Sequence, residues 1–293
     1  MMLRFLPFCE DDLNNADSRK NNRIVLELLS HYINLMPDAV TPEMIKDTKE
    51  LCGFDTEEAF RVLFAGILDV YDQRDLRRGW FSQMFKLLDF EKYENDPYKK
   101  NIVLPEKKLS DWEIRTMKYK PYELFVYDDL RSDSEGRILP CVGFFDKEYS
   151  YPAVLQGGRE WMLITPNEME TMRGPISDAF GNVVTYGLGL GYFAYMVSEK
   201  NEVSSVTVVE KDPSVIELFK DHILPQFPNK EKISIACADA LEYAAEDHPC
   251  DFVFADIWHD PSDGCDAYLH LKSLERRGIC YAYWIENTIK FYI

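Results

Sequence analysis

A loop with glycine at positions 187, 189 and 191 constrains the fold of this chain more than any other feature of its sequence. A β-branched run, Val183-Val-Thr, leads into the loop, and an apolar, helix-like run follows it. A second β-branched run, Val206-Thr-Val-Val, then ends on Glu210. This order predicts a strand, a tight turn, a helix and a parallel strand. Because glycine has no Cβ atom, the backbone can turn sharply here and lie directly against a ligand.

Glu210 gives the glycine loop a chemical partner. A carboxylate at the tip of the second strand can accept hydrogen bonds from both hydroxyls of a ribose, while backbone amides after the loop face the ligand. A glycine turn in an ordinary α/β sheet, followed by a surface glutamate, is the plainer interpretation. The two features occur in register, and together they favour a nucleoside site.

Two later β-rich runs also lead to acids. The first is followed by Asp239, and the second ends on Asp256. In an open parallel sheet the carboxyl ends of the strands meet at one edge, where ligands bind. We therefore expect Gly187, Glu210, Asp239 and Asp256 to converge on one crevice, with Asp239 placed to accept a hydrogen bond from an adenine amino group.

The chain before the glycine loop contains two segments of different periodicity. Apolar residues recur at helical spacing up to about residue 90, with capping signals at Thr41-Pro42 and Asp55, and a polar stretch with prolines follows. From about residue 122 the period changes to two, with a glycine pair at 157–158 that is typical of a hairpin. We expect a helical N-terminal domain (residues 1–110), a small antiparallel β unit (111–165) and a doubly wound, Rossmann-like parallel α/β domain (166–293).

Four motifs occur in the order found in class I S-adenosylmethionine-dependent methyltransferases, which the chain resembles over roughly residues 181–271: Tyr186-Gly-Leu-Gly-Leu-Gly, Val209-Glu210-Lys-Asp212, Ala238-Asp239-Ala240 and Phe254-Ala-Asp256-Ile. The resemblance implies that S-adenosylmethionine is the cofactor. It also implies a role for each motif: the loop of Tyr186, Gly187, Gly189 and Gly191 faces the methionine part, Glu210 holds the ribose, Asp239 and Ala240 hold the adenine, and Asp256 opens the catalytic loop.

The sequence departs from the related families at several positions. Class I methyltransferases commonly carry an acid two residues before the first loop glycine, where this chain has Thr185, so support for the cofactor's amino group is weakened or comes from elsewhere. Spermidine synthases also place a small β unit before this kind of domain, but they carry an acid where this chain has Leu190. They follow the fourth strand with Asp-Ser-Ser-Asp-Pro, and this chain has the longer Asp256-Ile-Trp-His-Asp260-Pro261. The resemblance ranks methyl transfer first and aminopropyl transfer second.

The loop after the fourth strand holds the candidate catalytic residues. Methyl transfer is a direct displacement at an activated sulfonium, so the protein mainly aligns the nucleophile, desolvates it and accepts one proton where needed. Asp256, His259 or Asp260 could take that proton, and Trp258 could stack on a cation or flank the sulfonium. Plainer roles are a loop cap for Asp256, a surface imidazole for His259 and a core position for Trp258. A metal site from His259, Asp260 and Asp263 is conceivable, but three polar residues in a turn usually only form the turn, so we expect no metal.

Two further functions stay open. Gly189-Leu-Gly191-Tyr-Phe-Ala194 matches the dinucleotide fingerprint, and Glu210 follows at nearly the expected distance. A dehydrogenase would need several further strands and a substrate domain after the fingerprint, and only about a hundred residues follow it here. A non-catalytic nucleoside-binding module is the other alternative, because the sequence offers no unambiguous base.

Charge and composition narrow the expected partners. The chain has 33 Lys and Arg against 51 Asp and Glu, a net charge of -18 that would repel a nucleic-acid backbone. A small-molecule or protein acceptor is the expected partner. No apolar run approaches a membrane span and the N-terminal stretch does not fit a signal peptide, so we expect a cytoplasmic protein that does not insert into membranes. The seven cysteines are scattered without a Cys-x-x-Cys pair, which predicts free thiols.

The last stretch of the chain, residues 279–293, is long enough for one strand or one helix. The antiparallel hairpin that usually ends the sheet of a class I methyltransferase therefore has no sequence to build it. We expect a short sheet. A second subunit could cover its exposed apolar edge or the helical domain, so a homodimer is one expected arrangement.

Overall fold

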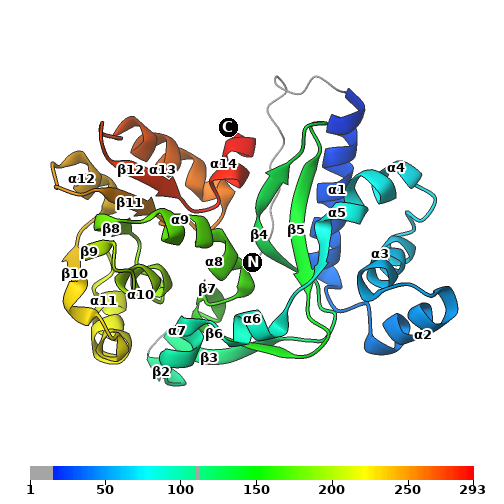
Figure 1. Cartoon of the computed structure of the whole chain (residues 1–293), viewed down its shortest axis with the longest axis horizontal. Helices are drawn as coiled ribbons and strands as arrows, with labels where there is room; N and C mark the ends of the chain where they lie inside the picture. Colours follow the sequence, from blue (N-terminus) through cyan, green and yellow to red (C-terminus); the bar gives the residue numbers. More distant parts are fainter. Residues whose placement is uncertain (1–15, 110–111) are drawn as a thin grey trace. The chain divides into compact units, whose positions relative to one another are not determined.

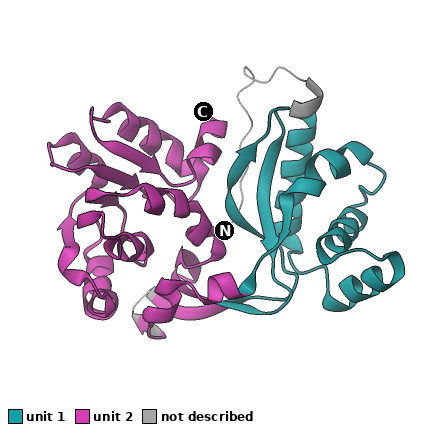
Figure 2. Ribbon diagram, in the orientation of Figure 1, with its two compact units in different colours: residues 1–90, 118–150 teal, residues 91–117, 151–293 magenta. Residues whose placement is uncertain are grey.

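The structure is a computed structural model that describes residues 16–109 and 112–293 (Figure 1). The described residues form two units (Figure 2): the first consists of the described residues up to Phe90 together with Lys118–Ser150, and the second of the described residues between Glu91 and Met117 together with Tyr151–Ile293. These boundaries differ from the three consecutive segments predicted from the sequence. The reason is that short helices after residue 90 pack within the second unit, where the hydroxyl of Tyr93 donates to Glu170 at 2.7 Å and that of Tyr98 donates to the Leu190 carbonyl at 2.5 Å.

Unit 1 packs helices against a three-stranded sheet. The helices are α1 (Ala16–Leu35), α2 (Pro42–Cys52), α3 (Thr56–Ile67), α4 (Arg74–Leu76), the π-helix η1 (Arg77–Phe81) and α5 (Ser82–Met84). The sheet order is β1 (Phe85–Leu87), β5 (Ile138–Phe144) and β4 (Phe125–Ser132). The β4 and β5 pair is antiparallel, as the sequence predicted, whereas β1 adds a parallel strand that the sequence analysis did not predict.

Capping residues fix the helix boundaries of unit 1. The Thr41 side chain accepts a hydrogen bond from the Met44 amide before α2 begins at Pro42. Asp55 and Glu58 form a reciprocal capping box at the start of α3. Both starts agree with the sequence signals, because a side-chain oxygen satisfies amides that have no partner in the first turn.

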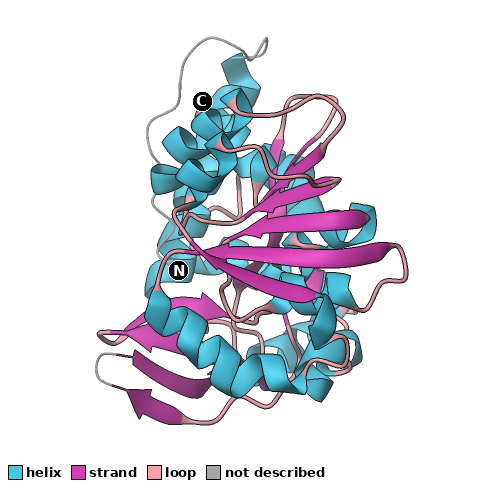
Figure 3. Ribbon diagram, turned by 90° about the vertical axis from the view of Figure 1, so that its left-hand side faces the viewer, coloured by secondary structure: helices cyan, strands magenta, loops and turns pink. Residues whose placement is uncertain are grey.

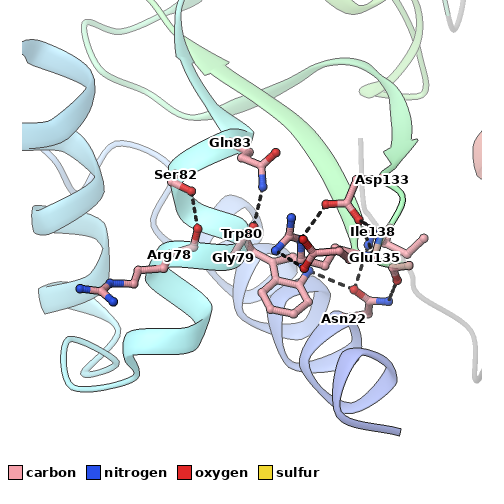
Figure 4. Close-up of polar contacts among 11 residues, drawn as sticks. Asn22, Arg78, Gly79, Trp80, Ser82, Gln83, Asp133, Glu135 and Ile138 are labelled. Carbon is pink, nitrogen blue, oxygen red and sulfur yellow. Dashed lines mark hydrogen bonds and ion pairs between the residues drawn. The ribbon is translucent and has the colours of Figure 1, made fainter. Parts of the chain in front are cut away.

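A buried polar side chain ties three elements of unit 1 together (Figure 4). Asn22 of α1 is 2% exposed. Its Oδ1 atom accepts hydrogen bonds from Trp80 Nε1 at 3.0 Å and from the Ile138 amide at 2.9 Å, and its Nδ2 atom donates to the Gly136 carbonyl at 3.0 Å. Each hydrogen bond satisfies a polar group that burial would otherwise leave without water.

Unit 2 contains a parallel five-stranded sheet (Figure 3). The strands lie in the order β10 (Ile233–Cys237), β9 (Val203–Glu210), β8 (Gly181–Tyr186), β11 (Phe252–Ala255) and β12 (Cys280–Tyr283). The chain starts at the central strand, β8, builds outward through β9 and β10, and then returns to the other side of β8 with β11. The predicted doubly wound, Rossmann-like sheet is confirmed.

Helices join the strands of this sheet. They are α10 (Tyr192–Ser198), α11 (Pro213–Leu218), the π-helix η2 (Phe219–Ile223), the 3₁₀ turns η3 (Leu224–Gln226) and η4 (Lys230–Lys232), α12 (Ala240–Ala245) and α13 (Pro261–Ser273). Among the described residues, none of the sheet's strands is antiparallel to its neighbour, so the expected absence of a terminal hairpin agrees with the topology. Residues 279–293 form both β12 and a helix, α14 (Glu286–Tyr292), where the sequence predicted only one of the two. A left-handed residue, Ile285, makes the turn between them.

Short elements precede the parallel sheet within unit 2. They are α6 (Phe90–Glu94), α7 (Pro97–Asn101), α8 (Pro166–Thr171), α9 (Arg173–Asp178) and parts of a four-stranded sheet of β2 (Lys107–Leu109), β3 (Trp112–Tyr119), β6 (Tyr149–Gln156) and β7 (Arg159–Leu163). The hairpin of β6 and β7 is antiparallel and turns through Gly157 and Gly158, as predicted. None of the helices in the described parts of the chain has the length and apolarity that crossing a bilayer requires.

The Asn22 network yields a prediction about stability. Asn22→Ala leaves the buried Trp80 indole, the buried Ile138 amide and the partly buried Gly136 carbonyl without this partner, so the free energy of unfolding should fall by roughly 2–4 kcal/mol. Urea denaturation measures this loss. Asn34→Ala, at an exposed position of the same helix, should change the free energy by less than about 0.5 kcal/mol. Equal effects of the two substitutions would contradict a stabilising role for the network.

Candidate functional site

The register of the parallel sheet brings four predicted site residues to one edge. Tyr186, the last residue of β8, lies opposite Val209 of β9 and Ala255 of β11. Glu210 of β9 lies opposite Cys237 of β10. The glycine loop, Glu210, Asp239 and Asp256 therefore follow the ends of adjacent strands, in the arrangement that open α/β sheets use for ligand binding.

The three glycines of the loop differ in what surrounds them. All have positive φ: 92° at Gly187, 52° at Gly189 and 78° at Gly191. A Cβ atom at Gly187 would lie 2.0 Å from the backbone carbonyl oxygen of Asp256, and one at Gly191 would lie 2.5 Å from the Phe219 ring. A Cβ atom at Gly189 would meet nothing within 4 Å. Close packing thus requires glycine at the two ends of the loop, and the middle of the loop faces open space in which a ligand could lie.

Glu210 holds the glycine loop with the same carboxylate that is predicted to bind the ribose. Its Oε2 atom accepts a hydrogen bond from the Leu188 amide at 3.2 Å, and its Oε1 atom accepts one from the Asp212 amide at 2.9 Å. A carboxylate offers about four acceptor positions, so two stay open for hydroxyl groups. The side chain is partly exposed and can reach a ligand.

Asp239 and Ala240 lie where the next helix begins. Oδ1 of Asp239 accepts hydrogen bonds from the amides of Leu241 at 2.8 Å and Glu242 at 3.3 Å, which caps α12. Ala240 is buried, whereas Asp239 keeps partial exposure. The remaining carboxylate oxygen of Asp239 is therefore available to a ligand at this edge.

Tyr186 contributes to the site through its backbone. Its ring is buried, and burial raises the pKa of its hydroxyl. The ring makes an edge contact with Tyr243, at 6.3 Å between centroids. Its carbonyl accepts a hydrogen bond from the Asp256 amide at 2.9 Å. This contact ties the end of β8 to the start of the loop that follows β11 (residues 256–260), called the strand-four loop because β11 is the fourth strand of the parallel sheet along the chain.

Asp256 is paired with an acid that sequence reasoning did not identify. Glu168, in the first turn of α8, interacts electrostatically with Asp256, and burial together with the Asp256 charge raises the pKa of Glu168 well above its usual value. Burial raises the pKa of Asp256 to about 7. Burial disfavours the charged form of each acid, and the charge on Asp256 further disfavours ionisation of Glu168. The sequence contained only a weak signal for Glu168, an acid after Thr165-Pro166 that also fits an ordinary helix start.

The other predicted catalytic residues have separate surroundings. Trp258 is 6% exposed and packs on the backbone of α13, where a Cβ atom on Gly264 would come within 2.8 Å of its ring; its Nε1 atom has no hydrogen-bond partner among the described residues. His259 is exposed, and its ring lies 5.1 Å from that of Trp161 on β7.

Asp260 and Asp263 are occupied by helix capping. The Asp260 side chain accepts a hydrogen bond from the Ser262 amide at 2.7 Å, and Asp263 reaches back to the amides of His259 and Asp260 at 3.0–3.2 Å. These contacts form a capping box at the start of α13. Of the four predicted catalytic residues, Asp256 is the one that interacts electrostatically with a second acid, Glu168.

Comparisons with known proteins give little further information. No protein-family model and no curated protein sequence matches the chain. Similar solved structures include a conserved hypothetical protein from Streptococcus pyogenes, with 16% identity, a TM-score of 0.27 and coverage of 32% of this chain and 59% of that one. They also include the spermidine synthase from Thermotoga maritima, with 14% identity, a TM-score of 0.35 and coverage of 50% and 57%. The match spans less than two thirds of either structure, and at these TM-scores it decides nothing about activity.

The glycine contacts yield a matched pair of variants. Gly187→Ala combines a left-handed backbone with a clash against the Asp256 carbonyl, so it should lower the free energy of unfolding by about 3 kcal/mol or more. Gly189→Ala meets only the backbone strain and should cost about 1–2 kcal/mol. Urea denaturation of both variants tests the difference. A Gly187 variant no less stable than the Gly189 variant would show that the close approach does not constrain the loop.

The acidic pair yields a prediction about pH. Since the pKa of Asp256 is raised from an unfolded value of about 4 to about 7, the folded chain binds more protons than the unfolded chain between these pH values. The stabilisation that comes from protonated Asp256 is fully present below about pH 4 and is lost as the pH rises through 7. Asp256→Asn cannot titrate, so its stability relative to the wild type should increase from pH 5 to pH 8. Urea denaturation at both pH values measures this, and a difference that does not change with pH would contradict the raised pKa.

Proposed function

We propose that this protein is an S-adenosylmethionine-dependent methyltransferase that acts on a small-molecule or protein acceptor. One observation carries the proposal: the glycine loop, Glu210, Asp239 and Asp256 follow the ends of four adjacent parallel strands. A nucleoside site needs a stretch of backbone that the ligand can lie against without meeting side chains. It also needs one hydrogen-bond acceptor for the ribose hydroxyls and one for the adenine amino group. The edge of this sheet offers these features in that spatial order.

In this proposal the adenosine extends from Asp239 to Glu210, and the sulfonium lies near the start of the strand-four loop. The sulfonium is already activated, so the chain's own residues mainly exclude water and orient the acceptor. Asp256 would accept the acceptor's proton. A base is most useful when its pKa lies near the working pH, and burial raises the pKa of Asp256 to about 7.

The second candidate is aminopropyl transfer, and the acids Glu168 and Asp256 are compatible with the amine acceptor of that reaction. Two carboxyl groups that repel each other would each gain from a cation between them, which fits a protonated amine as the acceptor. The same acids would also suit a methyltransferase with an amine acceptor. The reaction product distinguishes these two candidates, because only one of them carries an aminopropyl group.

The proposal also covers the partners, the cellular location and the oligomeric state of the protein. A net charge of -18 favours a cationic or neutral acceptor over nucleic acid. We also propose a cytoplasmic location, and a homodimer as an arrangement that would cover the edge of the sheet. The predicted assignment of the strand-four loop residues Trp258, His259 and Asp260 to catalysis is retained as part of this proposal.

A ligand panel tests the function. S-adenosylmethionine or S-adenosylhomocysteine at about a hundred times its dissociation constant should stabilise the fold by about 2.7 kcal/mol, which thermal denaturation detects. Decarboxylated S-adenosylmethionine and NAD complete the panel. A response to NAD alone would overturn the proposal in favour of a dehydrogenase, and a response to the decarboxylated cofactor alone would favour aminopropyl transfer.

Two variants serve as controls for the same panel. Glu210→Gln should weaken binding of every adenosine ligand by about tenfold or more, because a carboxylate that accepts from hydroxyl groups is lost. Asp256→Asn should leave affinity within a few fold while reducing product formation, since it acts on the acceptor in the transition state. A wild-type protein that binds the nucleoside tightly but converts no amine, polar metabolite or basic peptide would instead be a non-catalytic nucleoside-binding module.

A further inference from the structure

A short helix that comes before the β-strands of unit 2 is fixed against the end of the glycine loop. Tyr98 of α7 is 1% exposed, and its hydroxyl donates to the carbonyl of Leu190 at 2.5 Å. Asn101 of the same helix donates from Nδ2 to the hydroxyl of Tyr195 at 2.7 Å. The Tyr98 ring also makes edge contacts with Tyr192 and Tyr195, with centroids 5.6 and 5.4 Å apart. The second half of the glycine loop therefore depends on α7 for its position.

This packing places one carboxylate beside the residue that follows the last glycine. Asp96 caps α7, because its Oδ1 atom accepts from the amides of Tyr98 at 2.9 Å and Lys99 at 3.3 Å. Its Oδ2 atom accepts from the hydroxyl of Tyr192 at 3.0 Å, which helix capping does not require. Tyr192 comes directly after Gly191 in the sequence. Glu210 contacts the loop at Leu188, so the two acids flank the loop at opposite ends.

The proposed cofactor needs a carboxylate of this kind in its binding site. The amino-acid end of S-adenosylmethionine carries an ammonium group, and a cation in a partly buried crevice needs a counter-charge. Thr185, two residues before the first loop glycine, cannot supply it, because it is uncharged and 2% exposed. In the proposed function Glu210 binds the ribose and Asp256 faces the acceptor. Of the described acids that contact the loop or the residues next to it, Asp96 is then the one without an assigned ligand group.

We propose that Asp96 is the counter-charge for the ammonium group of the cofactor, an inference that rests on the proposed function. The carboxylate uses three of its roughly four acceptor positions in the described part of the chain and is partly exposed, so one position stays available. The ammonium of the neighbouring Lys99 pairs with Glu94 at 2.6 Å, and its charge also acts on Asp96, where it offsets part of the effect of burial. Burial raises the pKa of Asp96, which means that its anion is incompletely solvated and would gain from a nearby cation.

The experiment compares three ligands by isothermal titration calorimetry on the wild-type chain and on Asp96→Asn. The ligands are S-adenosylhomocysteine, its desamino analogue and 5′-methylthioadenosine, which share the adenosine and differ in the amino-acid part. Asparagine caps helices as well as aspartate does, so the variant should keep α7 in place. We expect Asp96→Asn to weaken the binding of S-adenosylhomocysteine by about 10- to 100-fold, which is the range for a hydrogen bond to a charged group. The affinities for the other two ligands should change by less than about threefold.

Tyr98→Phe is the control for a purely structural role. It removes the hydrogen bond to Leu190 and leaves Asp96 in place, so it should weaken the binding of all three ligands by a similar factor. If Asp96→Asn also weakens all three alike, or leaves S-adenosylhomocysteine unchanged, Asp96 only positions the helix and the inference is wrong. If the wild-type chain binds none of the three ligands, the proposed function itself fails.

Discussion

The close approach of Gly187 to Asp256 is the constraint on which the rest of the candidate site depends. The Gly187 amide donates to the Val209 carbonyl, and the Asp256 amide donates to the Tyr186 carbonyl, each at 2.9 Å. A Cβ atom at Gly187 would lie 2.0 Å from the Asp256 carbonyl oxygen. The turn after β8 is thus held between β9 and β11, and it cannot move without breaking one of these contacts. The glycine loop and the start of the strand-four loop therefore keep a fixed relation to each other.

The sequence predicted the parts of the site that local chemistry determines. A β-branched run that ends in glycine or an acid identifies both a strand and the residue at its tip, so Gly187, Glu210, Asp239 and Asp256 could be placed at one edge without a structure. The order of the strands also follows from the chain, because right-handed crossovers from a central strand leave few alternatives. Register then brings the tips together, since adjacent parallel strands of this sheet end level with one another.

What the sequence did not reveal depends on contacts between distant segments. Glu168 lies at an ordinary helix start, and only its partner Asp256, far along the chain, distinguishes it from a first-turn acid. Asp96 precedes Tyr192 by 96 positions, and nothing local links them. The same cause explains the boundaries of the two units. Helices near residue 95 are helical by their own sequence, but Tyr93 and Tyr98 find their partners beyond residue 165, and the periodicity of a segment does not indicate its packing partner.

The acids that follow the strands of the parallel sheet differ in their surroundings, and the difference bears on the proposed transfer reaction. Glu210, Asp239 and Asp260 accept hydrogen bonds from backbone amides, which fix the orientation of each carboxylate. Asp256 uses its backbone for packing, and its side chain interacts electrostatically with Glu168; burial raises the pKa of both acids. In the proposed function, a cationic acceptor bound beside these two acids would lower the pKa of both and would thereby displace protons before the transfer step. In the proposed function, an ionised carboxylate would then lie beside the ammonium and could accept the proton that the amine must lose to become a nucleophile.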